Sequence, residues 1–188
     1  LLFRIKAEVI RQNHRHSLCD TVHDPRYRQL IQGLSGWLEQ RAWQGILSDE
    51  QRERLTQPVL DFATLLLRYN HRRVTQYADQ FTKLSAEERH VLRIRVKELR
   101  YALDFFAALY PAFTVKAYLS ALARLQDCLG IMNDITVTRR LLDEARLTVV
   151  STARQVIEGW YGCRLDIHER QFAEVWQRFM ECERPWKG

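Results

Sequence analysis

This 188-residue sequence predicts an all-α fold, on three observations. Apolar residues recur at the three- and four-residue spacing of helices along almost the whole chain. Glycine and proline number only 7 and 4, which disfavours the many turns of an all-β fold. No segment alternates apolar and polar residues as a half-buried strand does. Antiparallel helices joined by short loops, packed as helical bundles, satisfy all three observations.

Residues 1–46 are predicted to form a first helical region. A helix is expected from Leu2 to about Arg15. A second begins at Pro25 with Asp24 as its N-cap and runs to about Trp43, because proline suits the first helical position. Its apolar face comprises Leu30, Leu34, Trp37, Leu38 and Ala42. Residues 47–58 are polar and charged and end in a proline, so they are predicted to be a linker.

Residues 59–188 are predicted to form a second helical bundle. A long helix starts at Val59, with apolar positions continuing to Phe81. Ser85 and Glu88 have the spacing of a capping box, so the next helix starts there and is expected to end at Tyr110–Pro111.

Three further helices complete the prediction. The first covers "FTVKAYLSALARLQDCLG", with Gly130 at the position just past its C-terminus. A shorter helix follows, with Asn133 as a cap, and the last runs from Ser151 to about Cys182. The inward positions expected of that last helix are Val156, Trp160, Leu165, Phe172, Trp176 and Phe179.

Charge and cysteine content limit the functional classes. The formal net charge is +6, a moderate basic excess whose placement matters more than its size. The cysteines (Cys19, Cys128, Cys163 and Cys182) form no CxxC pair, so we expect reduced thiols in the cytoplasm and neither a disulfide scaffold nor a zinc site. No apolar run is long enough to span a membrane, and no signal peptide is recognisable, so no membrane partner is expected.

The segment 88–103, "ERHVLRIRVKELRYAL", carries an unusual number of cations for a helix with a core-facing side. At about 100° per residue, four basic residues form one row about three turns long. This cationic stripe consists of His90, Arg93, Lys97 and Arg100, with Tyr101 beside it. Like charges at this spacing repel. Either internal carboxylates (Asp104, Asp127 and Asp134 are candidates) or an external polyanion should offset them, unless the stripe is merely a solvated face.

Two motifs carry a family resemblance. "HVLRIRVKELRYALDFFAALYP" fits H-x-x-R-[IV]-x-x-K-x-L-R-Y-x-L-x-F, and "LARLQDCLGIMND" fits L-x-x-L-Q-D-x-L-G-x-x-N-D. In this order they resemble the CHAD family, the conserved histidine α-helical domain. The resemblance implies two four-helix bundles with pseudo-twofold symmetry, each with a histidine motif, around a basic pore. The first-half motif has no counterpart here, so we expect an incomplete first half and natural sequence preceding Leu1.

The resemblance also implies a function. The family is associated with inorganic polyphosphate and often accompanies a CYTH-type triphosphatase domain in the same chain or operon. His90, Arg93, Lys97, Arg100 and Tyr101 match the second-half motif and are the expected anion-binding residues. Lys116 and Arg124 are candidates for a facing set of cations, whereas Gln126, Asp127, Asn133 and Asp134 are assigned structural roles.

Catalysis is not expected, and neither a cofactor nor a metal is predicted. No HExxH motif, P-loop, Gly-rich phosphate loop or ExExK pattern is present. Three alternatives stay open. A nucleic-acid-binding protein is disfavoured, because Tyr101 is the one aromatic residue near the stripe. An accessory domain of a triphosphate or polyphosphate hydrolase would use Asp127 and Asp134 for magnesium. A structural bundle would dock an acidic protein on the basic face.

Overall fold

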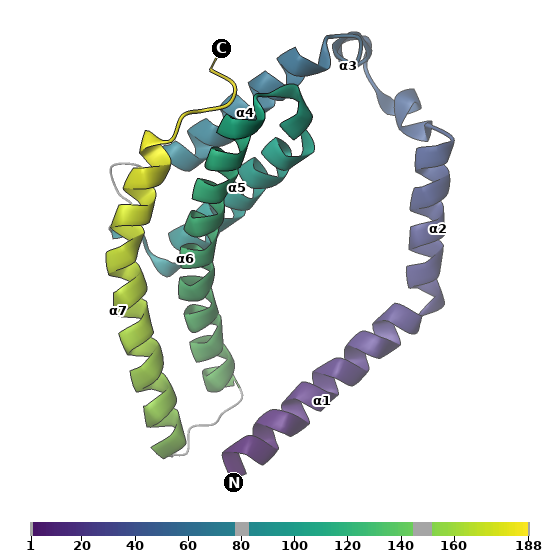
Figure 1. Ribbon diagram of the computed structural model, residues 1–188. Helices are drawn as coiled ribbons and strands as arrows, with labels where there is room; N and C mark the ends of the chain where they lie inside the picture. Colours follow the sequence, from purple (N-terminus) through teal and green to yellow (C-terminus); the bar gives the residue numbers. More distant parts are fainter. Residues whose placement is uncertain (1, 78–82, 145–151, 188) are drawn as a thin grey trace. The chain divides into compact units, whose positions relative to one another are not determined.

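All regular structure in the computed structural model is helical over the residues it describes, 2–77, 83–144 and 152–187, which confirms the predicted fold class (Figure 1). The chain divides into two compact units, Leu1–Gln57 (unit 1) and Pro58–Gly188 (unit 2). Unit 1 contains α1 (Leu2–His23), α2 (Pro25–Glu39), the 3₁₀ helix η1 (Ala42–Ile46) and α3 (Asp49–Arg54). Unit 2 contains α4 (Val59–Thr75), α5 (Ala86–Phe105), the 3₁₀ helix η3 (Ala107–Leu109), α6 (Ala112–Glu144) and α7 (Thr152–Glu181).

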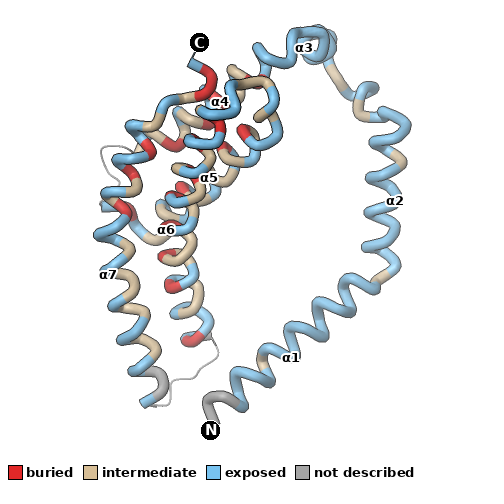
Figure 2. Tube along the Cα trace, in the orientation of Figure 1, coloured by how far each residue is buried: buried red, intermediate tan, exposed pale blue. Residues whose placement is uncertain are grey.

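Unit 2 holds the hydrophobic core. Its four long helices pack in chain order, each against the next, and every one of them contributes buried residues (Figure 2). The largest side chains with no more than 2% exposure are Leu67 and Val74 of α4, Leu92, Leu99 and Leu103 of α5, Tyr118, Leu122, Leu125, Leu129, Met132 and Ile135 of α6, and Phe179 of α7. On α5 and α6 these positions follow the three- and four-residue spacing that defines one helical face.

Two expected helix boundaries in unit 2 are wrong. α5 ends at Phe105 and is followed by η3, so it does not continue to Tyr110. α6 runs unbroken through Gly130, which has no positive φ and is therefore not a helix-ending residue. Continuation buries Met132 and Ile135 against the core, and this outweighs the roughly 1 kcal/mol that a glycine costs inside a helix.

Three further expectations for unit 2 need correction. Asn133 lies inside α6 and caps no helix. Val156 and Trp160 of α7 are 64% and 53% exposed, although the periodicity assigned them inward positions. The end of α7 is as predicted, with Phe172, Trp176 and Phe179 buried. α4 ends at Thr75, and the expected core position Phe81 lies outside the described residues.

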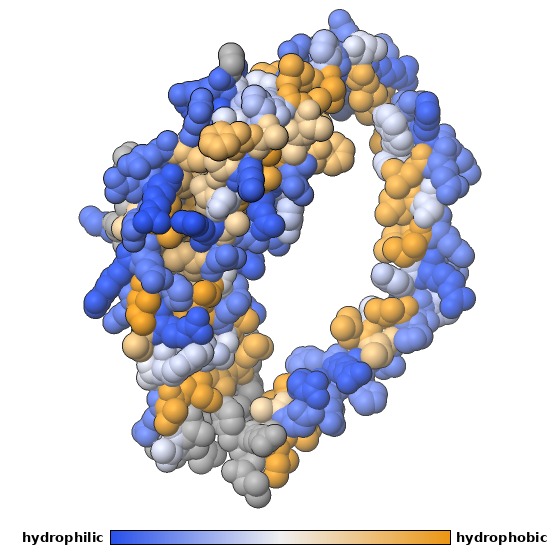
Figure 3. Space-filling model, in the orientation of Figure 1, coloured by the Kyte–Doolittle hydropathy of each residue, from blue (hydrophilic) through white to orange (hydrophobic). Residues whose placement is uncertain are grey.

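Unit 1 has helices but, among its residues whose burial the structure describes, no buried face. The apolar side chains of α2 gather along one edge of the helix and hydrophilic ones along the other (Figure 3), yet Leu30, Leu34, Trp37 and Leu38 are 40–66% exposed. The prediction that these residues form an apolar face is right, but the unit provides no second layer to cover it. α1 also extends to His23 rather than ending near Arg15, α2 ends at Glu39 before Trp43, and the expected linker includes α3.

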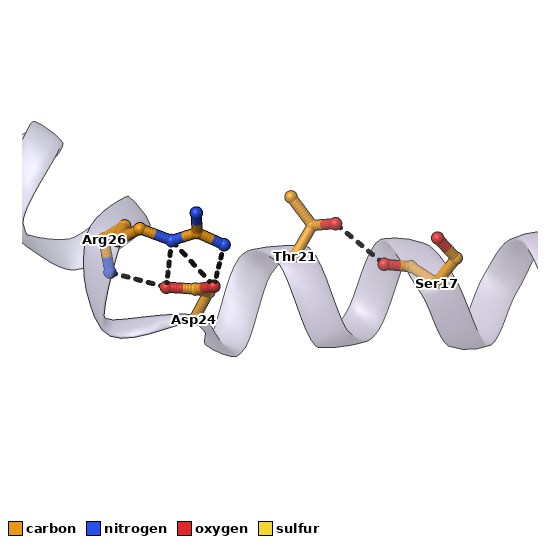
Figure 4. A network of polar contacts seen from close by, with 4 residues as sticks. All are labelled: Ser17, Thr21, Asp24 and Arg26. Atoms are coloured by element: carbon orange, nitrogen blue, oxygen red, sulfur yellow. Dashed lines mark hydrogen bonds and ion pairs between the residues drawn. The ribbon is translucent and has the colours of Figure 1, made fainter.

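The junction between α1 and α2 shows why α2 begins where it does. Asp24 is the N-cap, and its Oδ1 accepts a hydrogen bond from the backbone nitrogen of Arg26 at 2.8 Å (Figure 4). The Arg26 guanidinium also binds this carboxylate, with 2.6 Å between Nη2 and Oδ2, and these contacts lower the pKa of Asp24. Thr21 Oγ1 donates to the Ser17 carbonyl one turn earlier. The predicted Asp-Pro start is thereby confirmed.

No helix within the described ranges combines the length and the apolar character needed to cross a lipid bilayer.

Candidate anion-binding site

The cationic stripe lies on α5, whose start is set by its own sequence. Ser85 Oγ accepts from the backbone nitrogen of Glu88 at 3.2 Å, and Glu88 Oε2 accepts from the backbone nitrogen of Ser85 at 2.8 Å. This is the predicted capping box. Leu92, Val96 and Leu99 then face the core with no exposed surface, so helical geometry directs the stripe away from the core.

Two residues of the stripe are held by amide side chains of α6. His90 Nδ1 lies 2.8 Å from Asn133 Oδ1. Three turns further along α5, Arg100 Nη1 donates to Gln126 Oε1 at 2.9 Å. Both partners are uncharged, so they orient the imidazole and the guanidinium without neutralising them. A hydrogen bond of this kind restrains a long side chain that would otherwise sample many rotamers.

The other two residues are positioned by packing. Arg93 lies over Gly130 of α6, where an added Cβ would sit 3.8 Å from Arg93 Nε. That Nε is buried and has no hydrogen-bond partner in the described part of the chain. The ammonium of Lys97 lies 5.8 Å from the ring centroid of Tyr101, within the range of a cation–π contact. Tyr101 is 56% exposed, so it is a support for Lys97 rather than part of the core.

Other cations near α5 have structural partners. Arg89 pairs with Glu169 of α7 at 3.1 Å, and Arg73 of α4 pairs with Glu98 at 2.6 Å. Arg95 donates to the Arg73 carbonyl at 3.3 Å and lies over the ring of Tyr77. By contrast, Arg93, Lys97 and Arg100 form no ion pair with any residue that the structure describes. Within the described residues, Arg89 of α5 is thus paired with a carboxylate and Arg95 is held by a carbonyl and an aromatic ring, whereas Arg93, Lys97 and Arg100 of the stripe have no carboxylate partner.

The expected internal carboxylates do not compensate the stripe. Asp104, Asp127 and Asp134 are exposed, and none of the three forms an ion pair within the described ranges. Asp127 follows Gln126 directly and so lies about 100° around α6 from the face that holds Arg100.

The expected facing cations are not brought to the stripe. Arg124 is exposed and two residues from Gln126, which puts it about 160° around α6 from the face that meets α5. Lys116 is also exposed and lies about 15 Å along the axis from Gln126. In the antiparallel register of the two helices this is beyond Phe105, where α5 ends. The partners of the stripe on α6 are therefore neutral.

Gln126 and Asn133, for which the sequence predicts structural roles, instead contact Arg100 and His90 of the stripe. Gln126, Gly130 and Asn133 have i, i+4, i+7 spacing, so an unbroken helix presents them on one face. The signal was the motif Q-D-x-L-G-x-x-N-D itself. A helix that ended at Gly130 would place Gln126 and Asn133 on separate helices, so the shared face follows from the motif only when the helix continues.

Metal ligands are not gathered in the described part of the molecule, where no group of three or more His, Cys, Asp or Glu side chains is arranged to hold an ion.

Compared with known protein families, residues 2–143 match the CHAD domain. The matched range includes the cationic stripe and its partners on α6, and it stops before α7. No curated protein matches the chain.

Proposed function

The chain belongs to the CHAD domain family, and on that premise we propose that its cationic stripe binds inorganic polyphosphate or a similar polyanion without catalysing a reaction. The observation that carries the proposal is the state of Arg93, Lys97 and Arg100. They are oriented by α6 and by Tyr101, yet no carboxylate of the described chain neutralises them. Their mutual repulsion is offset when an anion lies along the row.

Polyphosphate chemistry suits this arrangement. The polymer has repeated negative charges and no bases to recognise, so its receptor needs repeated donors along one line. An arginine offers a planar fork of N–H groups to phosphate oxygens, and a lysine offers a point charge. His90 adds a further donor when both of its ring nitrogens are protonated. The stripe extends about 15 Å from His90 to Arg100, which is enough for a chain of several phosphates to follow.

The proposal is tested by removing the three charges together. We expect Arg93→Gln/Lys97→Gln/Arg100→Gln to lower the affinity for long-chain polyphosphate at least 100-fold at about 0.15 M salt. By analogy with nucleic-acid binding, the slope of log K against log salt should also fall by about 2 to 3. The matched control is Arg139→Gln/Arg170→Gln/Arg178→Gln, which removes the same charge from other parts of unit 2. Equal losses in the two variants, with helical content unchanged by circular dichroism, contradict a specific site.

A competition experiment distinguishes polyphosphate from nucleic acid. Single-stranded RNA of equal total charge should displace polyphosphate poorly, because Tyr101 already supports Lys97 and no row of stacking aromatics accompanies the stripe. Displacement by RNA at equal concentration would instead favour a nucleic-acid-binding function.

The proposed function is binding of the polyanion and not its hydrolysis. Magnesium-dependent phosphoryl transfer needs carboxylates beside the cations, and neither Asp127 nor Asp134 forms an ion pair with the stripe within the described residues. Phosphate release from polyphosphate in the presence of magnesium, abolished by Asp127→Asn, would overturn this part of the proposal. The proposed location is the cytoplasm, which suits four cysteines that form no disulfide, and a CYTH-type triphosphatase is the proposed companion.

A further inference from the structure

A second concentration of positive charge lies in unit 2 on a different side of α5 from the stripe. A pocket of about 590 Å³ is bounded by α4, the end of α7 and the C-terminal segment that follows it. Its charged lining residues are Arg68, Arg72 and Arg184, and no aspartate or glutamate lines it. α4 meets α5 through Arg95, which is about 160° around that helix from Lys97. The pocket and the stripe are therefore separate sites.

The floor of the pocket is a packed cluster of aromatic side chains. His71 Nδ1 and Tyr118 Oη are 2.7 Å apart, and the His71 ring lies 5.8 Å from Trp186 and 5.9 Å from Phe179. Tyr118 is fully buried, and Trp186 is 3% exposed. Trp186 anchors the C-terminal segment on α4 and so fixes the backbone on which Arg184 is carried. Arg68 and Arg72 of α4 and Arg184 of the C-terminal segment thereby line one concavity.

These arginines lack internal partners. No ion pair or guanidinium hydrogen bond links Arg68, Arg72 or Arg184 to any residue in the described ranges. Arg68 and Arg72 are four residues apart on α4, a spacing at which like charges repel. The resulting positive field acts on His71: burial first, then Arg184 and Lys187, lower its pKa to about 4. The imidazole is therefore neutral near pH 7 and adds no further charge to the floor.

The pocket has the chemistry of a small-molecule site. Its volume falls within the range of about 300–1,000 Å³ that is typical of ligand pockets. Guanidinium groups suit phosphate oxygens, while Tyr69, Met180 and Trp186 supply apolar lining on the rest of its wall. We propose that this pocket binds the di- or triphosphate group of a small molecule, and that the bound phosphates join α4 to the C-terminal segment through Arg68, Arg72 and Arg184.

The test uses the full chain with inorganic tripolyphosphate and adenosine triphosphate as probes, measured by calorimetry. We expect Arg72→Gln/Arg184→Gln to lower the affinity for the triphosphate probes at least 10-fold. The control Arg139→Gln/Arg170→Gln, which removes the same charge elsewhere in unit 2, should change it less than 3-fold. Affinity for long-chain polyphosphate, which reports the stripe, should change equally in the two variants. Equal loss of triphosphate binding in the two variants would overturn the proposal that the pocket binds phosphate.

A second readout does not depend on these substitutions. An anion beside His71 opposes the field of Arg184 and Lys187, so saturation with a bound probe should raise the pKa of His71 measured by NMR. The His71 signals are assigned by their absence in His71→Gln. Unchanged His71 signals at saturation would overturn the proposal even if the probe binds elsewhere. Tighter binding of adenosine triphosphate than of tripolyphosphate identifies a nucleotide-like ligand that uses the apolar wall, whereas equal affinities identify an inorganic phosphate chain.

Discussion

Units 1 and 2 both consist of helices, but different interactions support them. Within the described residues of unit 1, every side-chain hydrogen bond joins residues no more than four positions apart, as between Arg11 and Glu8. In unit 2 the bonds that connect different helices span from 22 positions, Arg95 to Arg73, to 80 positions, Arg89 to Glu169. Helical periodicity is enough to give a helix an apolar face, as in α2. A core and a binding site form only where a second helix packs on that face, as in unit 2.

The largest expected effect tests the core. Leu99→Ala should lower the free energy of unfolding by about 2–5 kcal/mol, because Leu99 is fully buried and the substitution leaves a cavity. Leu34→Ala on α2, where Leu34 is 50% exposed, should cost less than about 0.5 kcal/mol. Urea denaturation followed by circular dichroism measures both. A comparable cost at Leu34 would break the comparison, since it would mean that the apolar face of α2 is covered in solution.

The next effect concerns thiol reactivity. Cys128 of α6 is buried, its Sγ lies 3.3 Å from the His168 carbonyl, and burial raises the pKa of its thiol to about 11. At pH 8 its thiolate fraction is about 100-fold below that of an ordinary thiol. Cys19 of unit 1 is exposed and should be alkylated at least that much faster. Mass spectrometry of partly alkylated protein gives the rates. Similar rates at the two thiols would show that unit 2 opens readily.

A smaller effect depends on pH. The pKa of His71 is lowered to about 4 from an ordinary 6.5. Between pH 6.5 and pH 4 the imidazole is therefore protonated in the unfolded chain but neutral in the folded chain. The free energy of unfolding should therefore be fully retained above pH 6.5 and should fall as the pH decreases from 6.5 to 4. Denaturation curves at several pH values measure this fall. His71→Gln should show a shallower decline, and an identical decline would remove His71 as its source.

The smallest effect concerns the orientation of the stripe. Asn133→Ala should lower polyphosphate affinity about 2- to 10-fold, since one hydrogen bond contributes about 0.5–1.5 kcal/mol and it restrains His90. Thr136→Ala is the matched control, because Thr136 makes only a local bond to the Met132 carbonyl on the same helix. In a His90→Ala background the effect of Asn133→Ala should vanish. Full persistence there would show that Asn133 does not act through His90.

Prediction from sequence succeeded where local chemistry decides. The Asp24–Pro25 start of α2 and the Ser85–Glu88 capping box are correct because a cap depends on groups within three residues. The same locality explains the error at Gly130. A glycine that ends many helices is carried inside α6 because the helix beyond it buries Met132, a contact that no local pattern records.

The candidate site was predicted only in part. The stripe itself follows from spacing on one helix. Its neutral partners, Gln126 and Asn133, are 26 and 43 residues from the side chains they hold. The charge of Arg124 suggests a facing cation, but α6 directs this residue to another side.

The sequence by itself determined where most helices lie, which face of each is apolar, and that four basic groups share one side of α5, because these features depend on the 3.6-residue period and on groups a few positions apart. The tertiary structure alone decided which cations pair with a carboxylate, which do not, and that Trp186 and His71 line one basic pocket. The physical reason is that those outcomes require side chains distant along the chain to meet, and the choice of partner is made by the packing of a shared core.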